Sequence, residues 1–294
     1  MINKPLSVLF ISVISSSFAA IFILSCDAPS LSIALFRLLF TTVLLMPFAI
    51  INKKVRKELL ELPRSTFFIM AGIGLILAVH FAFWITSLEF TSVASSVILV
   101  TIHPIIVAPA AYYFFKEKLS IVNLIGILVS VSGVVILIYG NYGLSSLKLD
   151  TIEGNMLAII GGIAAGFYIL GGRRIRRNVS IVTYAIVVYG VGTLTLFFIC
   201  LLFNAPVYGL NTNDYWIILL MAVVSGIFGH TLYNWSLEYI RASLASVVLL
   251  GEPFFSTLFA FAIPWVQQVP SEFTIVGGSI IILGIYMTSK NSSK

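Results

Sequence analysis

Ten long apolar runs dominate this chain and limit the folds that it can adopt. They cover residues 6–26, 31–51, 66–88, 93–115, 121–140, 154–172, 181–203, 215–238, 242–264 and 273–288. Each run is close to the roughly 20 residues that a helix needs to cross a hydrocarbon core about 30 Å thick. The runs are continuous rather than alternating, which argues against the strands of a membrane barrel. The sequence therefore predicts an all-α integral membrane protein with ten transmembrane helices.

Composition excludes a soluble domain. Hydrophobic residues make up 60% of the chain and charged residues 10%, whereas soluble domains average about 45–50% and 25%. A net charge of +6 can indicate a nucleic-acid partner. Here, however, the basic residues form short clusters between the apolar runs, which is typical of membrane orientation. We therefore expect the lipid bilayer, and no nucleic acid, as a partner.

The basic residues also predict the orientation of the chain. If the N-terminus is cytoplasmic, 15 of the 17 lysines and arginines lie on the cytoplasmic side. Lys148 then lies on the other side, and Arg37 lies within the second run. Cytoplasmic loops of membrane proteins carry such an excess of basic residues. We therefore expect both termini to be cytoplasmic.

A repeat divides the chain into two halves. The tetrapeptide SLEF at residues 87–90 recurs as SLEY at 236–239. Each copy is followed, at the same distance, by a proline, which is Pro104 in the first half and Pro253 in the second. The repeat predicts the same order of helices in both halves.

Each half holds five helices, the first within residues 1–146 and the second within 147–294. Because five is odd, the second half begins on the opposite side of the membrane, so the halves are inverted copies. Inverted repeats are the architecture of many secondary transporters, whose substrate site lies near the midplane between the repeats. This organisation predicts a carrier that works by alternating access.

Glycines near the end of each half also match. Gly126 and Gly133 correspond to Gly277 and Gly284. In each half the two are seven residues apart, which places them on one stripe of a helix. The simplest use of these stripes is a packing seam within the bundle, with a dimer interface as the alternative. Monomer and homodimer are both compatible with the sequence.

Two matched pairs combine a polar residue with a proline near the middle of a predicted helix. They are His103–Pro104 in the fourth and Glu252–Pro253 in the ninth. We expect the two pairs to face each other across a central cavity, with His103 and Glu252 as candidate substrate-binding residues. A proline at that depth frees a backbone carbonyl and can serve as a hinge beside a cavity. A carboxylate within a span is a candidate binding site, and scarce water favours its protonated form, which suits proton coupling. The alternative is a structural role, in which Glu252 pairs with Arg37 or the backbone.

Further polar residues are candidates to line the same cavity. His80 and Trp84 lie one turn apart on the third predicted helix. His230 and Asn234 repeat that spacing on the eighth. The alternative for all four is hydrogen bonding between helices, which polar groups commonly provide in membranes. Their matched positions in the two halves favour a place at the cavity.

For three other residues the neighbouring sequence gives weaker evidence of a role. Ser16 on the first helix and Tyr168 on the sixth are candidates to contact a substrate, with close packing as the alternative. We interpret Arg37 as a structural charge, because it lies in the outer third of its helix, where a long side chain snorkels or pairs. The three histidines lack the spacing of zinc sites, so we predict no metal.

Two segments carry a resemblance to a known family. HPIIVAPAAYYFFKEKLS at residues 103–120 and EPFFSTLFAF at 252–261 are similar to motifs of the EamA branch of the drug/metabolite transporter superfamily. The resemblance extends over nearly the whole chain, as two EamA-type halves. Arg37 matches an arginine that is frequent in the second helix of the family. The second half departs from the pattern at Gln268, where the family usually has a glutamate.

The resemblance implies a carrier that exports, or in some members imports, amino acids, nucleobases or related metabolites across a prokaryotic plasma membrane. It implies no use of ATP, and the sequence has no GxxxxGK[ST] phosphate-binding loop. HExxH and GxSxG, which mark hydrolytic enzymes, are absent as well. We therefore predict a secondary transporter for a small-molecule substrate, not an enzyme, with no cofactor and with the proton as candidate coupling ion. A passive channel or uniporter for small polar solutes is the alternative.

Overall fold

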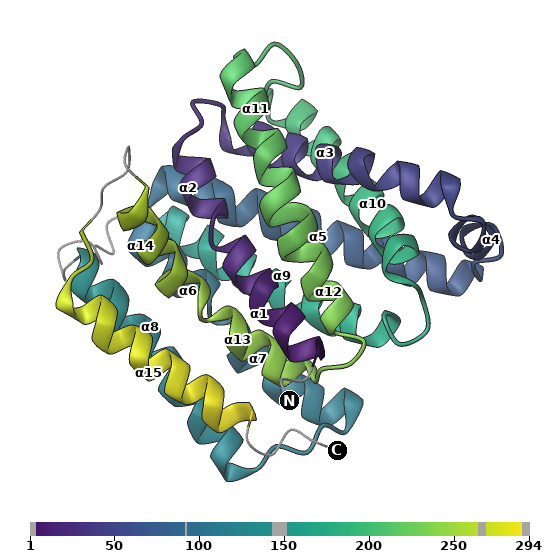
Figure 1. Cartoon of the computed structure of the whole chain (residues 1–294). Coiled ribbons are helices and arrows are strands. Elements are labelled where there is room, and N and C mark those ends of the chain that lie inside the picture. Colours follow the sequence, from purple (N-terminus) through teal and green to yellow (C-terminus); the bar gives the residue numbers. More distant parts are fainter. Residues whose placement is uncertain (1–3, 92, 143–151, 264–268, 290–294) are drawn as a thin grey trace.

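Every element that the structure describes is a helix (Figure 1). This computed structural model describes residues 4–91, 93–142, 152–263 and 269–289. Ten helices in these ranges are long and apolar enough to cross a membrane, and they lie within a few residues of the predicted runs. The prediction of an all-α protein with ten spans is confirmed. The proposed boundary between the halves, and also Lys148 and Gln268, lie outside the described residues.

Several of the ten spans consist of more than one helical segment. The first five spans are α1 (Lys4–Ser16) with α2 (Ala19–Leu24), α3 (Ser30–Ile51), α5 (Arg64–Phe90), α6 (Val93–Val100) with α7 (His103–Phe115), and α8 (Ile121–Tyr142). The others are α9 (Ile152–Ile175), α10 (Ile181–Leu202), α11 (Thr212–Met221) with the π-helix η2 (Ala222–Thr231) and α12 (Leu232–Ser236), α13 (Ala242–Leu249) with α14 (Glu252–Ala262), and α15 (Glu272–Ser289). The short α4 (Lys53–Leu60) connects α3 to α5.

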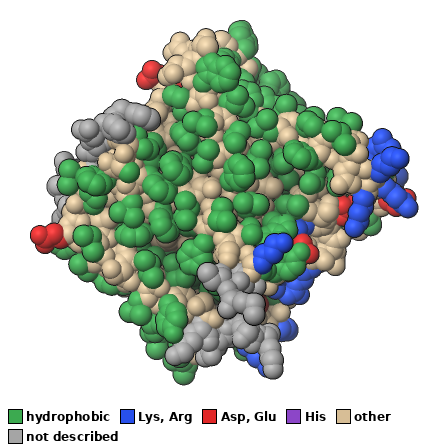
Figure 2. All heavy atoms as spheres, in the orientation of Figure 1, with side chains coloured by type: hydrophobic (Ala, Val, Ile, Leu, Met, Phe, Trp, Pro, Cys, Tyr) green, Lys and Arg blue, Asp and Glu red, His purple; other side chains and the backbone are tan. Residues whose placement is uncertain are grey.

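The outer surface has the chemistry of a lipid-facing bundle. Figure 2 shows one face covered by hydrophobic side chains, with Lys and Arg gathered along one edge near α4 and the N-terminus. Large apolar residues such as Phe48 and Leu202 are 62% and 75% exposed. In water such a surface would be strongly unfavourable, whereas lipid tails solvate it.

The predicted glycine stripes face each other across one helix pair. A Cβ atom placed on Gly133 would lie 2.7 Å from the carbonyl oxygen of Gly277, and one on Gly284 would lie 2.5 Å from that of Gly126. Such short distances mean that the backbones of α8 and α15 touch, as small residues allow in membrane bundles. The stripes form a packing seam within the chain, so they do not form a dimer interface.

Two spans are interrupted just before the matched prolines. The fourth span breaks between α6 and α7, which restarts at His103, and the ninth breaks between α13 and α14, which restarts at Glu252. Each proline is thus in the first turn of a new helix, where its missing N–H leaves no hydrogen bond unmade. The first span is also interrupted, and there the carbonyl of Ser17 accepts a hydrogen bond from Ser256. These interruptions place irregular backbone at the centre of the bundle, where a cavity lies.

Candidate functional site

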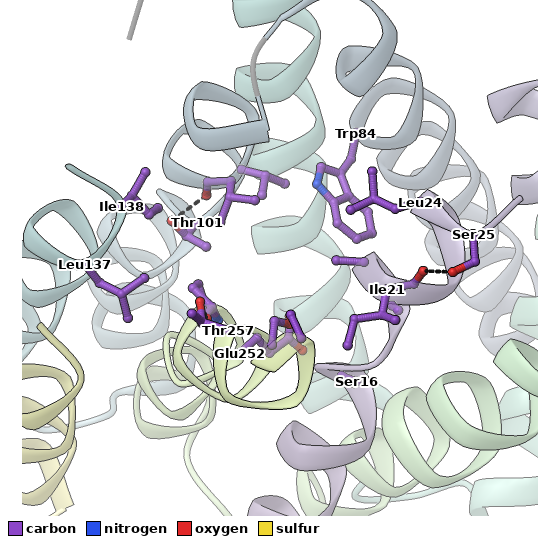
Figure 3. A pocket seen from close by; sticks show the side chains of 17 residues that line it. Ser16, Ile21, Leu24, Ser25, Trp84, Thr101, Leu137, Ile138, Glu252 and Thr257 are labelled. Carbon is purple, nitrogen blue, oxygen red and sulfur yellow. Dashed lines mark hydrogen bonds between the residues drawn. The ribbon is translucent and has the colours of Figure 1, made fainter. Parts of the chain in front are cut away.

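The wider of two adjoining cavities has a volume of about 420 Å³. Most of its lining is apolar and comes from α2, α6, α8 and α14. Trp84 and Glu252 lie on opposite sides of it (Figure 3). It extends from Glu252 towards Leu24 and Ala260, near the ends of α2 and α14. Its volume falls within the roughly 300–1,000 Å³ of pockets that hold small molecules.

A second cavity, of about 80 Å³, adjoins the first because Ser16, Trp84, Thr101 and Glu252 line both. We call the larger one the outer cavity and the smaller one the inner cavity. The inner cavity has titratable and charged side chains that the outer cavity lacks. Its other polar or charged lining residues are Arg37, His80, His103, Tyr168, His230 and Tyr233. Side chains from seven different spans therefore converge on a small volume at the centre of the bundle.

The structure brings together most of the side chains that the sequence suggested. The predicted substrate-binding residues that line the two cavities are Glu252, His103, His80, Trp84, His230, Ser16 and Tyr168. Asn234 is buried behind them, where its amide donates 2.6 Å hydrogen bonds to the Tyr168 hydroxyl and the His230 carbonyl. Pro253 lines the outer cavity, whereas Pro104 is buried next to His103. Asn234 thus holds two lining residues in place rather than facing the cavity.

Aromatic contacts fix the histidines of the inner cavity. Nδ1 of His80 lies 2.9 Å from the carbonyl of Gly161, which can only accept, so this nitrogen carries a proton. The His80 ring stacks on Trp84 with centroids 5.8 Å apart. His230 meets the Phe81 ring edge to face at 5.2 Å. These rings form a rigid wall between α5 and the π-helix η2.

Glu252 lies where the outer and inner cavities meet. It is the first residue of α14, and Ser16 lines both cavities with it. Arg37 and Tyr233 line the inner cavity with it and interact with it electrostatically. In the described part of the chain, Arg37 and Glu252 form no ion pair. The inner cavity therefore holds a guanidinium and a carboxyl group that do not form an ion pair.

The side chain of Arg37 is buried and does not snorkel to the membrane surface, and among the described residues it forms no ion pair. Its side chain is 1% exposed, and its guanidinium carbon lies 4.5 Å from the centroid of the Phe81 ring. Within the described residues its Nη1 has no hydrogen-bond partner. The reason is that α3 is packed against α5, α10 and η2, which directs this side chain inwards rather than towards the membrane surface.

A polar network joins the helices at the end of the bundle away from the outer cavity. Glu117, just after α7, accepts hydrogen bonds from the backbone of Ala242 and Ser243 at the start of α13. Arg173 lies 3.7 Å from Glu117, and it donates to the carbonyl of Leu237. These contacts tie α7, α9, α12 and α13 together at this end of the bundle.

A second ion pair, between Arg176 and Glu238, lies at the same end of the bundle. Arg176 donates to the carboxylate of Glu238 at 2.7 Å and to the carbonyl of Asn234 at 3.2 Å. Burial lowers the pKa of Arg176 from its ordinary value, whereas the nearby Glu238 acts in the opposite direction. The sequence analysis did not identify this network. Only the basic cluster after the sixth run hinted at it, and we used that cluster for orientation alone.

Five polar lining residues were also missed, namely Ser25, Thr101, Tyr233, Ser256 and Thr257. Helical periodicity could have found Tyr233 and Ser256. Thr101 lies two residues before His103, and Tyr233 is one turn after His230. Ser256 and Thr257 follow Glu252 by about one turn on α14 and line the outer cavity. Polar residues one turn from a predicted site share its helical face.

The histidines and Glu252 line the inner cavity without forming a cage. Among the described residues, no group of three His, Cys, Asp or Glu side chains is arranged to hold a metal ion. The arrangement instead offers hydrogen-bond donors and acceptors, a guanidinium, a carboxyl group and an adjoining cavity with mostly apolar lining. Such a site suits reversible binding of a small amphipathic molecule.

Comparisons with known proteins agree with this architecture. Residues 3–139 and 152–290 match the model of the EamA-like transporter family. A protein of Archaeoglobus fulgidus named "Uncharacterized transporter" is 25% identical over 264 residues, which is 88% of this chain and 87% of the relative. Another of that name, from Clostridium kluyveri, is 22% identical over 260 residues, which is 87% of this chain and 82% of the relative.

One solved crystal structure shows the same fold. It matches with a TM-score of 0.80 at 17% sequence identity, covering 98% of this chain and 97% of that one. The ten apolar spans, the central cavity and these matches together identify a multi-pass membrane transporter. The chain belongs to the EamA-like transporter family, within the drug/metabolite transporter superfamily.

Proposed function

We propose that this transporter is a secondary active carrier that exports small metabolites, such as amino acids or related compounds, across the plasma membrane. Glu252 binds a proton or the ammonium group of the substrate at the junction of the two cavities. The observation that carries the proposal is the position of this carboxylate. It lies, partly exposed, where a cavity of about 420 Å³ meets one of about 80 Å³.

The cost of placing a carboxylate at this depth supports a binding role. A charged residue at the middle of a span costs roughly 2.5–3.5 kcal/mol on translocon insertion scales. In the described structure, Glu252 has no cationic partner in direct contact that offsets this cost. Such a position suits a carboxyl group that takes up a proton or an amine during transport. The transport cycle then uses both its free form and its proton- or amine-bound form.

Alternating access follows from the unequal ends of the bundle. The outer cavity extends towards the ends of α2 and α14, whereas the Glu117 and Arg176 networks join the helices at the other end. The basic clusters favour placing the networked end in the cytoplasm, with both termini. The conformation described then faces outwards, and the breaks before His103 and Glu252 are proposed as the hinges of the exchange.

Substitution of Glu252 tests the proposal. Glu252→Gln keeps the shape and hydrogen bonding of the side chain but removes its charge and its titration. We expect this variant to fold and to lose transport roughly tenfold or more, which corresponds to about 1.4 kcal/mol of barrier, or to lose its dependence on pH. Glu252→Asp keeps the titration with a shorter reach and should retain part of the activity. The measurement is the initial rate of uptake into proteoliposomes against pH.

Glu153→Gln is the matched control, because Glu153 is exposed in the first turn of α9. It removes the same charge outside the cavities and should leave both rate and pH profile unchanged. An unchanged profile in Glu252→Gln would show that the carboxylate is only structural. Counterflow, in which internal substrate accelerates uptake of external substrate, separates a carrier from a passive channel.

A further inference from the structure

We propose that Arg37 is the anion-binding residue of the inner cavity, so that the transported molecule carries a carboxylate that enters this cavity first. The inference rests on the proposed carrier function and assigns a role to a residue that the sequence presented as structural. The guanidinium of Arg37 has three relevant properties. The group is buried, it lines the inner cavity, and its Nη1 lacks a hydrogen-bond partner among the described residues.

Other buried arginines in the same bundle donate hydrogen bonds to protein acceptors. Arg176, which is also 1% exposed, donates to the carbonyl of Asn234 and pairs with Glu238. Arg173, 5% exposed, donates to two backbone carbonyls. The fold therefore provides acceptors for arginines that hold helices together. Arg37 differs, since its described contact is the face of the Phe81 ring at 4.5 Å.

The Phe81 ring holds the guanidinium without saturating it. A cation over an aromatic face is attracted by the ring, but its N–H groups remain available as donors. Phe81 is itself packed edge to face against His230, so the position of the cation is supported from α5 and η2. A preorganised guanidinium with free donors matches the two oxygens of a carboxylate.

Other groups around the inner cavity point to the same ligand chemistry. The Tyr233 hydroxyl and the indole N–H of Trp84 also lack partners among the described residues, and both can donate. Arg37 is the one arginine or lysine among the described residues that line this cavity. A singly charged acceptor such as a carboxylate fits one guanidinium and these donors better than a doubly charged phosphate does.

Volume and charge then set the orientation of the substrate. The inner cavity, about 80 Å³, accommodates a small charged group, while only the outer cavity, about 420 Å³, accommodates the body of a metabolite. Glu252 lies at the junction and takes a proton or an amine. A molecule with its carboxylate at Arg37 therefore places its apolar part against the lining of the outer cavity.

The test compares carboxylates with matched uncharged amides. Thermal unfolding of the purified protein is measured in detergent with hexanoate and with hexanamide, in the parent protein and in Arg37→Gln and Arg37→Lys. We expect hexanoate to stabilise the parent protein at a concentration about tenfold lower than hexanamide does. Arg37→Gln should abolish this preference, and Arg37→Lys should retain part of it. Arg176→Gln is the control, which should lower the unfolding temperature and leave the preference intact.

Equal action of acid and amide on the parent protein, no stabilisation by hexanoate, or a preference that survives in Arg37→Gln would each overturn the inference. Counterflow of leucine against leucinamide in proteoliposomes then separates it from the proposed function. If hexanoate acts through Arg37 but neither leucine nor leucinamide shows counterflow, the anion site is supported and the proposed carrier function is refuted. If both show equal saturable counterflow, the carrier stands and the role of Arg37 fails.

Discussion

Three glutamate side chains each accept a hydrogen bond from a backbone N–H group at the start of a helix that is distant in the sequence. Glu89 accepts from Ser30 at the start of α3 at 3.0 Å, and Glu117 accepts from Ala242 at the start of α13 at 2.9 Å. Glu58 accepts from Ser180 before α10 at 2.9 Å. Free N–H groups and the helix dipole both favour a negative charge at these positions. These glutamates connect helices, whereas Glu252 lies in the first turn of its own helix and faces a cavity.

Glu58, outside the spans, has a pKa that the fold alters. Partial burial acts to raise the pKa of this carboxyl group, but hydrogen bonds from Ser180 and Thr183 outweigh burial, so the pKa lies below its ordinary value. A group with a lowered pKa stabilises the fold at all pH values above the ordinary value of about 4.3. That contribution is lost as the pH falls through the lowered pKa.

We therefore expect Glu58→Gln to lower the unfolding temperature at neutral pH. The free energy of unfolding should fall by about 1 kcal/mol, as is typical when a helix cap is removed. The deficit should shrink below about pH 4, where the parent protein loses the same contribution. The measurement is thermal unfolding in detergent between neutral and acidic pH. Glu61→Gln is the control, because Glu61 pairs only with Lys57 at 3.8 Å on an exposed surface. A deficit in Glu58→Gln that is constant with pH would contradict the capping role.

At the scale of the helices, close backbone contact and interruption serve different purposes. The α8–α15 pair is held by backbones that touch at Gly126, Gly133, Gly277 and Gly284. The fourth and ninth spans instead break at the cavity and restart with a proline in the first turn. Continuous helices with small residues give a rigid pair, while a broken span has fewer backbone hydrogen bonds to resist bending.

A single added methyl group should disrupt the α8–α15 seam. In Gly277→Ala the new Cβ would lie 2.6 Å from the carbonyl oxygen of Gly133 and 2.6 Å from the nitrogen of Leu137. Because both atoms belong to the backbone, the helices must separate. We expect the free energy of unfolding to fall by about 1–3 kcal/mol. Thermal unfolding in detergent measures it.

Gly190→Ala is the control for helix propensity. A Cβ atom at Gly190, in α10, meets nothing within 4 Å. Alanine there should be neutral or should stabilise the helix by up to about 1 kcal/mol. If Gly277→Ala is as stable as Gly190→Ala, the glycine stripes do not determine the packing of α8 on α15.

At the scale of the whole molecule, the orientation in the membrane determines which face each cavity serves. Exposed positions for labelling lie at both ends of the bundle: Lys54 in α4, Arg174 near the end of α9 and Asn211 before α11. The inverted arrangement predicts that the first two, one from each half, are cytoplasmic and that Asn211 is external.

Single cysteines at these positions test that prediction after Cys26→Ser and Cys200→Ser remove the native thiols. We expect an impermeant maleimide to label Asn211→Cys in intact cells. It should label Lys54→Cys and Arg174→Cys only after the membrane is opened. The control is labelling of all three in detergent, which shows that each thiol is reactive. Labelling of Lys54→Cys and Arg174→Cys from opposite faces would refute both the ten-span topology and the inversion.

The sequence by itself determined the spans and the positions of two of their breaks. A membrane requires about 20 apolar residues per crossing, which is a local property that any window of sequence displays. A proline within such a run can mark a break for an equally local reason, since it lacks an N–H group, although Pro47 and Pro109 lie inside continuous helices. The breaks before His103 and Glu252 were therefore predictable from the sequence, as was a polar centre that includes His80 and His230.

Only the tertiary structure decided how each helix is rotated about its axis and which side chains share a cavity. Arg37 has the sequence context of a snorkelling residue, yet the packing of α3 against α5, α10 and η2 directs it into the inner cavity. Asn234 has the spacing of a lining residue, yet it points to Tyr168 behind the wall. Rotation depends on the small residues and polar contacts of neighbouring helices that are distant in the sequence. For that reason no single helix reveals it.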